Sequence, residues 1–82
     1  MWHVTPEFVI ELKSASDRVQ TLRAKMQEWI DNGVALGWLI LPESRTVEVY
    51  KPGSVDVMTG LDNIAGEAPV EGFVLRLGKI WP

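Results

Sequence analysis

Hydrophobic and polar residues alternate between positions 7 and 13, which is the pattern of a β-strand with two unlike faces. A period of two places Phe8, Ile10 and Leu12 on one face. The other face carries Glu7, Val9, Glu11 and Lys13. The second face is unusual because it brings charged side chains into what otherwise looks like an interior strand.

The spacing of apolar residues then changes and predicts a helix over residues 18–32. One stripe along this helix is apolar and consists of Val19, Leu22, Met26, Trp29 and Ile30. We expect Ser16 or Asp17 to cap its N-terminus, and Gly33 stands where a left-handed residue ends a helix. The single stripe indicates that the helix packs on a sheet by one face only.

Two further strands are predicted at residues 37–41 and 45–51, joined by a loop of about four residues as in an antiparallel hairpin. A short strand is also predicted at residues 55–58, and residues 59–69 are expected to form a loop. A last strand is predicted at residues 73–77.

The order strand, helix, strand is typical of a right-handed crossover between parallel strands. The hairpin then adds antiparallel strands, so the predicted class is α/β, with a mixed sheet and a helix on one of its faces. A chain of 82 residues is long enough for one domain at most, so we expect residues 1–82 to form a single domain.

The composition, 46% hydrophobic and 23% charged, is that of a globular domain. Cysteine is absent, which excludes disulfides, a thiolate zinc site and a cysteine nucleophile. The longest uncharged run, residues 32–42, is far shorter than the about 20 residues of a membrane helix. We therefore expect a cytoplasmic protein that does not enter the membrane. The net charge of −3 gives no general attraction for nucleic acid.

One grouping has the composition of a reactive site, namely Glu11 and Lys13 at the end of the first predicted strand. Their side chains share a face and lie about 7 Å apart along the chain. A carboxylate, together with the carbonyl of Leu12, offers the oxygen ligands that Mg²⁺ prefers. A neighbouring lysine orients water or stabilises charge on a phosphate. An ordinary charge pair at a strand end has the same spacing, and the spacing alone favours that simpler interpretation.

Several segments also occur in a characteristic order along almost the whole chain. They are Pro6–Ser14, Asp17-Arg18, Lys25–Trp29, Asn32–Val34, Gly37–Ile40, Val47–Tyr50, Pro69–Leu75 and Ile80-Trp81. This ordered set resembles the C-terminal half of the Uma-type family of putative restriction endonucleases, within the PD-(D/E)XK nuclease superfamily. The resemblance implies a restriction-endonuclease-like core in which Glu11 is a catalytic metal ligand, with magnesium as the cofactor. It also implies that Lys13 is the catalytic cation that orients water or phosphate.

The sequence departs from the family pattern upstream of this strand. Such nucleases carry another metal-binding aspartate on a preceding strand, and only five residues precede Pro6. Asp17 follows the strand, but capping the helix is its more favoured role. We therefore expect a truncated, metal-dependent endonuclease-like domain that is inactive as an isolated monomer. The alternatives are a non-catalytic oligomerisation or interaction module with the same fold, and a small α/β domain whose resemblance is coincidental.

The truncation also predicts partners. Without upstream strands, the strand at residues 7–13 has one exposed edge, so we expect a homo-oligomer that joins sheets there. Nucleic acid is the second expected partner, with DNA favoured over RNA. Arg18, Arg23 and Lys25 border the helix stripe, where they either contact phosphates or form a solvated rim. Trp29 and Trp38 are interpreted as core residues rather than stacking platforms for bases.

Overall fold

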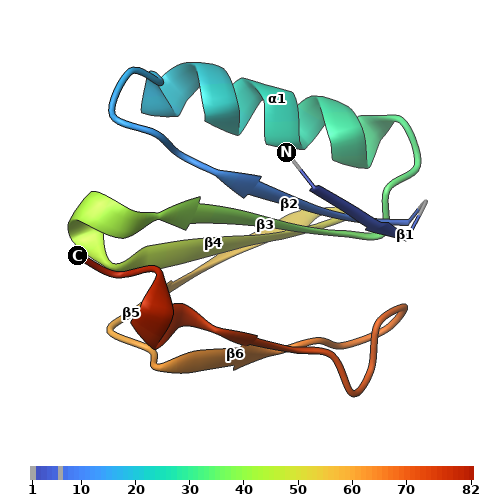
Figure 1. Cartoon of the computed structure of the whole chain (residues 1–82). Coiled ribbons are helices and arrows are strands. Elements are labelled where there is room, and N and C mark those ends of the chain that lie inside the picture. The colour runs from blue at the N-terminus through green and yellow to red at the C-terminus, as the bar shows by residue number, and fades with distance from the viewer. Residues whose placement is uncertain (1, 6) are drawn as a thin grey trace.

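The computed structural model describes residues 2–5 and 7–82, and these residues form a five-stranded sheet between a helix and a smaller, two-stranded sheet (Figure 1). The large sheet contains β1 (Trp2–Thr5), β2 (Phe8–Leu12), β3 (Leu36–Leu41), β4 (Thr46–Lys51) and β5 (Ser54–Thr59). The helix is α1 (Val19–Asp31), and the small sheet contains β6 (Asn63–Ala65) and β7 (Val74–Arg76). Two short 3-10 turns, η1 (Pro42–Ser44) and η2 (Leu77–Lys79), follow β3 and β7.

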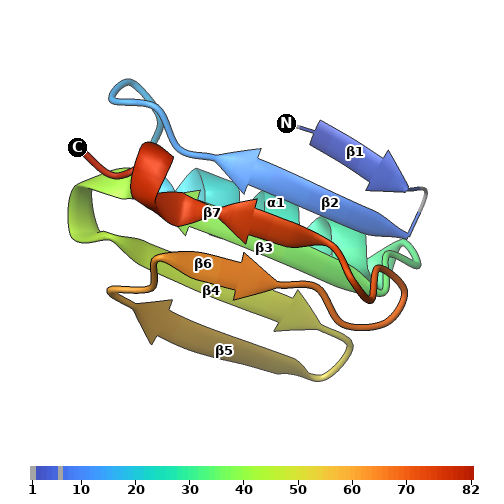
Figure 2. The same cartoon turned by 60° about the horizontal axis from the view of Figure 1, so that its bottom comes forward.

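The strands of the large sheet lie in the order β1-β2-β3-β4-β5 (Figure 2). Strands β2 and β3 are parallel and are connected by α1, which confirms the predicted crossover. Strands β3 and β4 form the predicted antiparallel hairpin. The central strand is β3, so β2 is an interior strand next to the centre.

The prediction that residues 7–13 have an exposed edge is wrong. Strand β1 pairs with β2 along that edge, with Trp2 opposite Ile10 and His3 opposite Val9. A four-residue segment is too short to show the alternation by which a strand is recognised, so this pairing was not predicted. Among the described residues, the outer strands of the large sheet are therefore β1 and β5.

The large sheet has a hydrophobic core on each face. Phe8 and Ile10 of β2 contact the core shared with β6 and β7, whereas Val9 contacts the core shared with α1. This division confirms the two predicted faces of β2. Trp38 lies in the first core with an exposed fraction of 1%, and its ring meets that of Phe8 edge to face at 4.8 Å. Its predicted core position is thus confirmed.

The buried stripe of α1 is also confirmed, since Leu22, Met26 and Ile30 pack on the sheet and Trp29 is half-buried. Residue 37 of β3 is glycine, and a Cβ atom there would meet the Met26 methyl group at 2.6 Å. This glycine therefore lets the helix approach the sheet closely. With 13 residues, α1 is the one α-helix of the described part, where no helix is long and apolar enough to cross a membrane.

Two local predictions are corrected by the structure. The helix begins after Arg18 without a side-chain cap, because Asp17 accepts hydrogen bonds from the backbone nitrogen and hydroxyl group of Ser14, at 2.9 Å each. Residues 59–69 were predicted as a loop, but they contain strand β6. This strand has only three residues, which is too few to show an alternating pattern in the sequence. The predicted left-handed end of the helix is confirmed at Gly33, where φ is +101°.

Candidate functional site

The face of the sheet beneath α1 carries two buried carboxylates. Glu11 of β2 pairs in register with Leu39 of β3, and Leu39 pairs with Glu48 of β4. The two glutamates therefore flank Leu39 in one row across three strands, about 10 Å apart at two strand spacings. Their exposed fractions are only 6% and 4%. Carboxylates buried to this degree require cationic or hydrogen-bonding partners.

The helix supplies a cation to each carboxylate. Arg23 and Lys25 are two residues apart, so they point to opposite flanks of the helix, about 200° from each other. The Nη2 atom of Arg23 lies 2.7 Å from Oε2 of Glu48, and Nζ of Lys25 lies 3.5 Å from Oε2 of Glu11. Arg23 and Lys25, which border the apolar stripe on its two sides, thus each form an ion pair with a glutamate of the sheet.

Arg23, Glu48 and Tyr50 form one hydrogen-bonded group. The Arg23 Nε donates to both oxygens of Glu48, at 3.2 and 3.0 Å, and the Tyr50 hydroxyl group donates to Oε1 at 2.8 Å. Burial raises the pKa of Glu48, but the hydrogen bonds from Arg23 and Tyr50 outweigh it, and the pKa is lower than usual. Burial and the contact with Glu48 raise the pKa of Tyr50. At neutral pH the group is therefore a charged glutamate held by a charged arginine and a neutral tyrosine.

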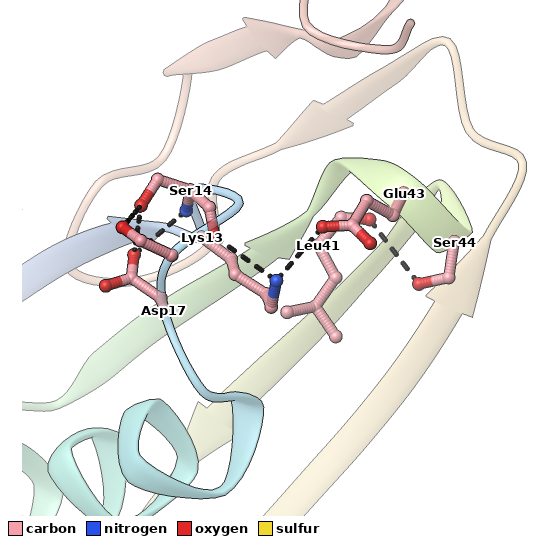
Figure 3. A network of polar contacts seen from close by, with 7 residues as sticks. Lys13, Ser14, Asp17, Leu41, Glu43 and Ser44 are labelled. Atoms are coloured by element: carbon pink, nitrogen blue, oxygen red, sulfur yellow. Dashed lines mark hydrogen bonds and ion pairs between the residues drawn. The ribbon is translucent and has the colours of Figure 1, made fainter.

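Lys13 has a different partner. Its Nζ donates to Oε1 of Glu43 at 3.0 Å and to the backbone oxygen of Ser14 at 3.2 Å (Figure 3). This contact arises because β2 and β3 are parallel, so that the residues after both strands meet at one edge of the sheet. The side chain of Lys13 is 15% exposed and that of Glu43 is 74% exposed. A sheltered lysine is thus paired with a glutamate at the surface.

A hollow of about 280 Å³ opens at this edge of the sheet. It is lined by Lys13, Val19, Arg23, Leu41, Glu43 and Ser44. The lining comes from the carboxyl ends of parallel strands and the first turns of the following helix, where α/β sheets commonly bind ligands. Two cations, Lys13 and Arg23, therefore share one open hollow.

The two residues predicted as catalytic are Glu11, which lies in β2, and Lys13, which directly follows it. Their side chains form ion pairs with two different elements. Glu11 pairs with α1 through Lys25, and Lys13 pairs with η1. The roles of Arg23 and Glu48 were not predicted. The available signal was the apolar stripe of α1 together with a glutamate on a buried strand, because a helix that covers Glu48 must bring a cation to it from one flank.

The chemistry of magnesium provides a test of this site. Mg²⁺ requires an octahedral shell of oxygens, of which carboxylates usually supply one or two. Among residues 7–82, whose side chains the structure describes, no three side chains of histidine, cysteine, aspartate or glutamate cluster as they would around a metal ion. The ammonium group of Lys25 also lies 3.5 Å from Glu11, and Asp17 is engaged with Ser14. The described side chains around Glu11 therefore fit an ion pair with Lys25 better than a magnesium site.

Comparison with known proteins places these observations in a family. The Uma2 family, described as putative restriction endonuclease, matches residues 2–78. A solved structure with a similar fold is a putative nuclease belonging to DUF820 from Anabaena variabilis, with 22% sequence identity and a TM-score of 0.78. The match covers 98% of this chain and 46% of the other, so this chain spans about half the length of that relative. No curated protein matches the sequence.

Proposed function

Because the chain belongs to the Uma2 family of putative restriction endonucleases, we propose that it is a nuclease-like domain that binds nucleic acid. DNA is the favoured ligand, since restriction endonucleases act on DNA. We further propose that the chain does not hydrolyse phosphodiesters on its own. The mixed sheet and helix agree with this proposal, since about half of the putative nuclease from Anabaena variabilis has a similar fold.

The observation that carries the proposal is the position of Glu11. It is a buried carboxylate at the end of an interior strand, with Lys25 at 3.5 Å and Lys13 two residues further along the chain. A carboxylate is costly to bury and needs a charged or hydrogen-bonding partner, so the placement of Glu11 beside Lys25 inside the fold supports a functional role for this edge of the sheet. In this proposal Glu11 is a magnesium ligand only where further oxygen ligands come from outside the described residues, and Lys13 contacts the phosphate.

A plasmid-nicking assay with Mg²⁺ or Mn²⁺ tests this function. The wild-type chain is expected to nick no faster than Glu11→Ala or Lys13→Ala, because Lys25 holds the Glu11 carboxylate at 3.5 Å and Glu43 holds Lys13 at 3.0 Å. Glu71→Ala, which changes an exposed acid in the turn before β7, serves as the matched control. Cleavage that is lost in both site variants and kept in the control would show that the chain assembles a complete site.

A second candidate function, self-association, is favoured by the exposed outer strand β5. All six of its residues are exposed, including Val55, Val57 and Met58 with exposed fractions of 46%, 62% and 38%. Outer strands with apolar side chains pair readily with a further strand. We propose that the occupant of this edge is β5 of a second copy, which would join two sheets into one.

The charge on β5 selects how two copies would pair. An antiparallel pair centred on Asp56 sets two carboxylates opposite each other, which is unfavourable. A pair centred on Val57 sets the two valines opposite each other and places Asp56 beside Met58 of the partner strand. Within its own chain Asp56 is also balanced by Lys51, at 3.9 Å. The symmetric registers centred on Asp56 and on Val57 pair the most residues of β5, and the carboxylate contact disfavours the first, so we favour a dimer with Val57 at its centre.

A further inference from the structure

We propose that Lys13 and Arg23 together bind one phosphate group of a nucleic-acid backbone in the hollow beside β2 and β3. We propose in addition that Glu43, which forms an ion pair with Lys13 in the free protein, competes with this phosphate for the lysine. The inference rests on the proposed function for its ligand, nucleic acid, but it concerns binding and does not require cleavage or a metal. It assigns roles to Arg23 and Glu43 that family membership alone does not give.

The orientation of Arg23 is the first argument. Its hydrogen bonds to Glu48 use Nε and Nη2, and 41% of its side chain is exposed toward solvent. Glu48 is itself held by Tyr50, so the guanidinium plane is fixed before any ligand arrives. The contact with Glu48 raises the pKa of Arg23, which keeps its charge constant. A fixed planar guanidinium is well suited to bind phosphate oxygens.

The position of Lys13 is the second argument. Lys13 lines the same hollow as Arg23 but comes from a different element, so two cations converge on one space. Its side chain is only 15% exposed, and its stem is therefore held in place by the surrounding protein. A volume of about 280 Å³ accommodates a phosphate group together with ordered water.

The pairing of Glu43 is the third argument. Glu43 is 74% exposed, and ion pairs with so much exposure contribute little to stability. A phosphodiester can therefore displace this carboxylate from Lys13 at small cost. The exchange replaces one anion by another, so both cations of the hollow stay neutralised. Glu43 thus acts as an internal competitor that weakens binding without abolishing it.

Titration with inorganic phosphate, in EDTA and at constant ionic strength, tests the proposal through amide chemical shifts. Glu43→Gln is expected to tighten binding about fivefold, since it removes a competing surface ion pair. Arg23→Lys is expected to weaken binding about fivefold, because lysine keeps the charge beside Glu48 but loses the planar fork. Arg76→Gln, at an exposed position of β7, should bind like the wild type.

A second titration with a short DNA duplex, followed by fluorescence anisotropy, distinguishes a nucleic-acid backbone from free phosphate. The same order of affinities is expected, with Glu43→Gln tightest and Arg23→Lys weakest. Thermal melting of each variant confirms that it is folded. The proposal is overturned if either site variant binds phosphate like the wild type, or if the duplex does not follow the same order. Both titrations are metal-free, so they succeed or fail independently of the cleavage assay.

Discussion

Val57→Lys is expected to be monomeric at concentrations at which the wild-type chain is a dimer. Val57 lies at the centre of the proposed pair of β5 strands and is the most exposed of the large hydrophobic side chains described, at 62%. A lysine there places two positive charges opposite each other and is a common natural means of blocking strand pairing. The single strand buries less surface than a standard interface, so we expect a micromolar dimer, detectable by light scattering across a concentration series.

Val74→Lys provides the matched control for this experiment. Val74 has a similar exposed fraction, 54%, but lies on β7 of the small sheet. The same substitution there adds the same charge without touching β5, so this variant should remain dimeric. A wild-type chain that is monomeric throughout the series contradicts the proposed dimer, and so does a Val74→Lys variant that dissociates as readily as Val57→Lys.

Arg23→Met is expected to destabilise the fold strongly at neutral pH and much less in acid. The pKa of Glu48 in the folded protein is below its usual value of 4.5, so this group stabilises the fold fully above that pH. The contribution is lost as the pH falls through the lowered pKa. In the variant the main hydrogen bonds are absent while the burial remains, so the pKa of Glu48 rises and its ionisation opposes folding.

Urea unfolding of both proteins at neutral pH and at a series of acidic pH values below 4.5 measures this difference, since the contribution of Glu48 is lost as the pH falls through its lowered pKa. The midpoint of Arg23→Met should fall well below the wild-type midpoint at neutral pH and approach it in acid. Arg76→Met, which removes an exposed arginine from β7, should change neither value appreciably. A loss that stays equal across the whole acidic series would mean that Arg23 stabilises the fold through its packing and not through the charge of Glu48.

The parts of the fold that were predicted are those with a local signal. The alternation in β2 and the stripe of α1 repeat within a few residues, and both patterns are confirmed by the two cores. Strands β1 and β6 have four and three residues, which is too short for a period to show. Their positions depend on pairing with distant segments, as β1 pairs with β2 and β6 pairs with β7.

The candidate site was predictable to a similar extent. Glu11 was singled out because it shares a strand face with Lys13 and the pair matches the acid-x-lysine pattern of the family, and its catalytic role stays a prediction. Its neighbours were not recognised, because the contacts join residues far apart in the sequence. The Lys13–Glu43 hydrogen bond spans 30 residues, and the Arg23–Glu48 bonds span 25. These contacts depend on the parallel pairing of β2 with β3 and on the placement of α1 above Leu39, which no local pattern specifies.

The most direct test of the central claim is a titration with Mn²⁺, in which paramagnetic broadening of amide signals locates the bound metal. The claim is that Glu11 belongs to a nuclease-like site which the described residues do not complete. We therefore expect no stronger broadening near Glu11 than near exposed acids such as Glu71, because Lys25 holds the carboxylate at 3.5 Å. Selective broadening around Glu11 and Leu12 at low Mn²⁺, removed by Glu11→Gln, would contradict the claim and show that this chain binds the metal by itself.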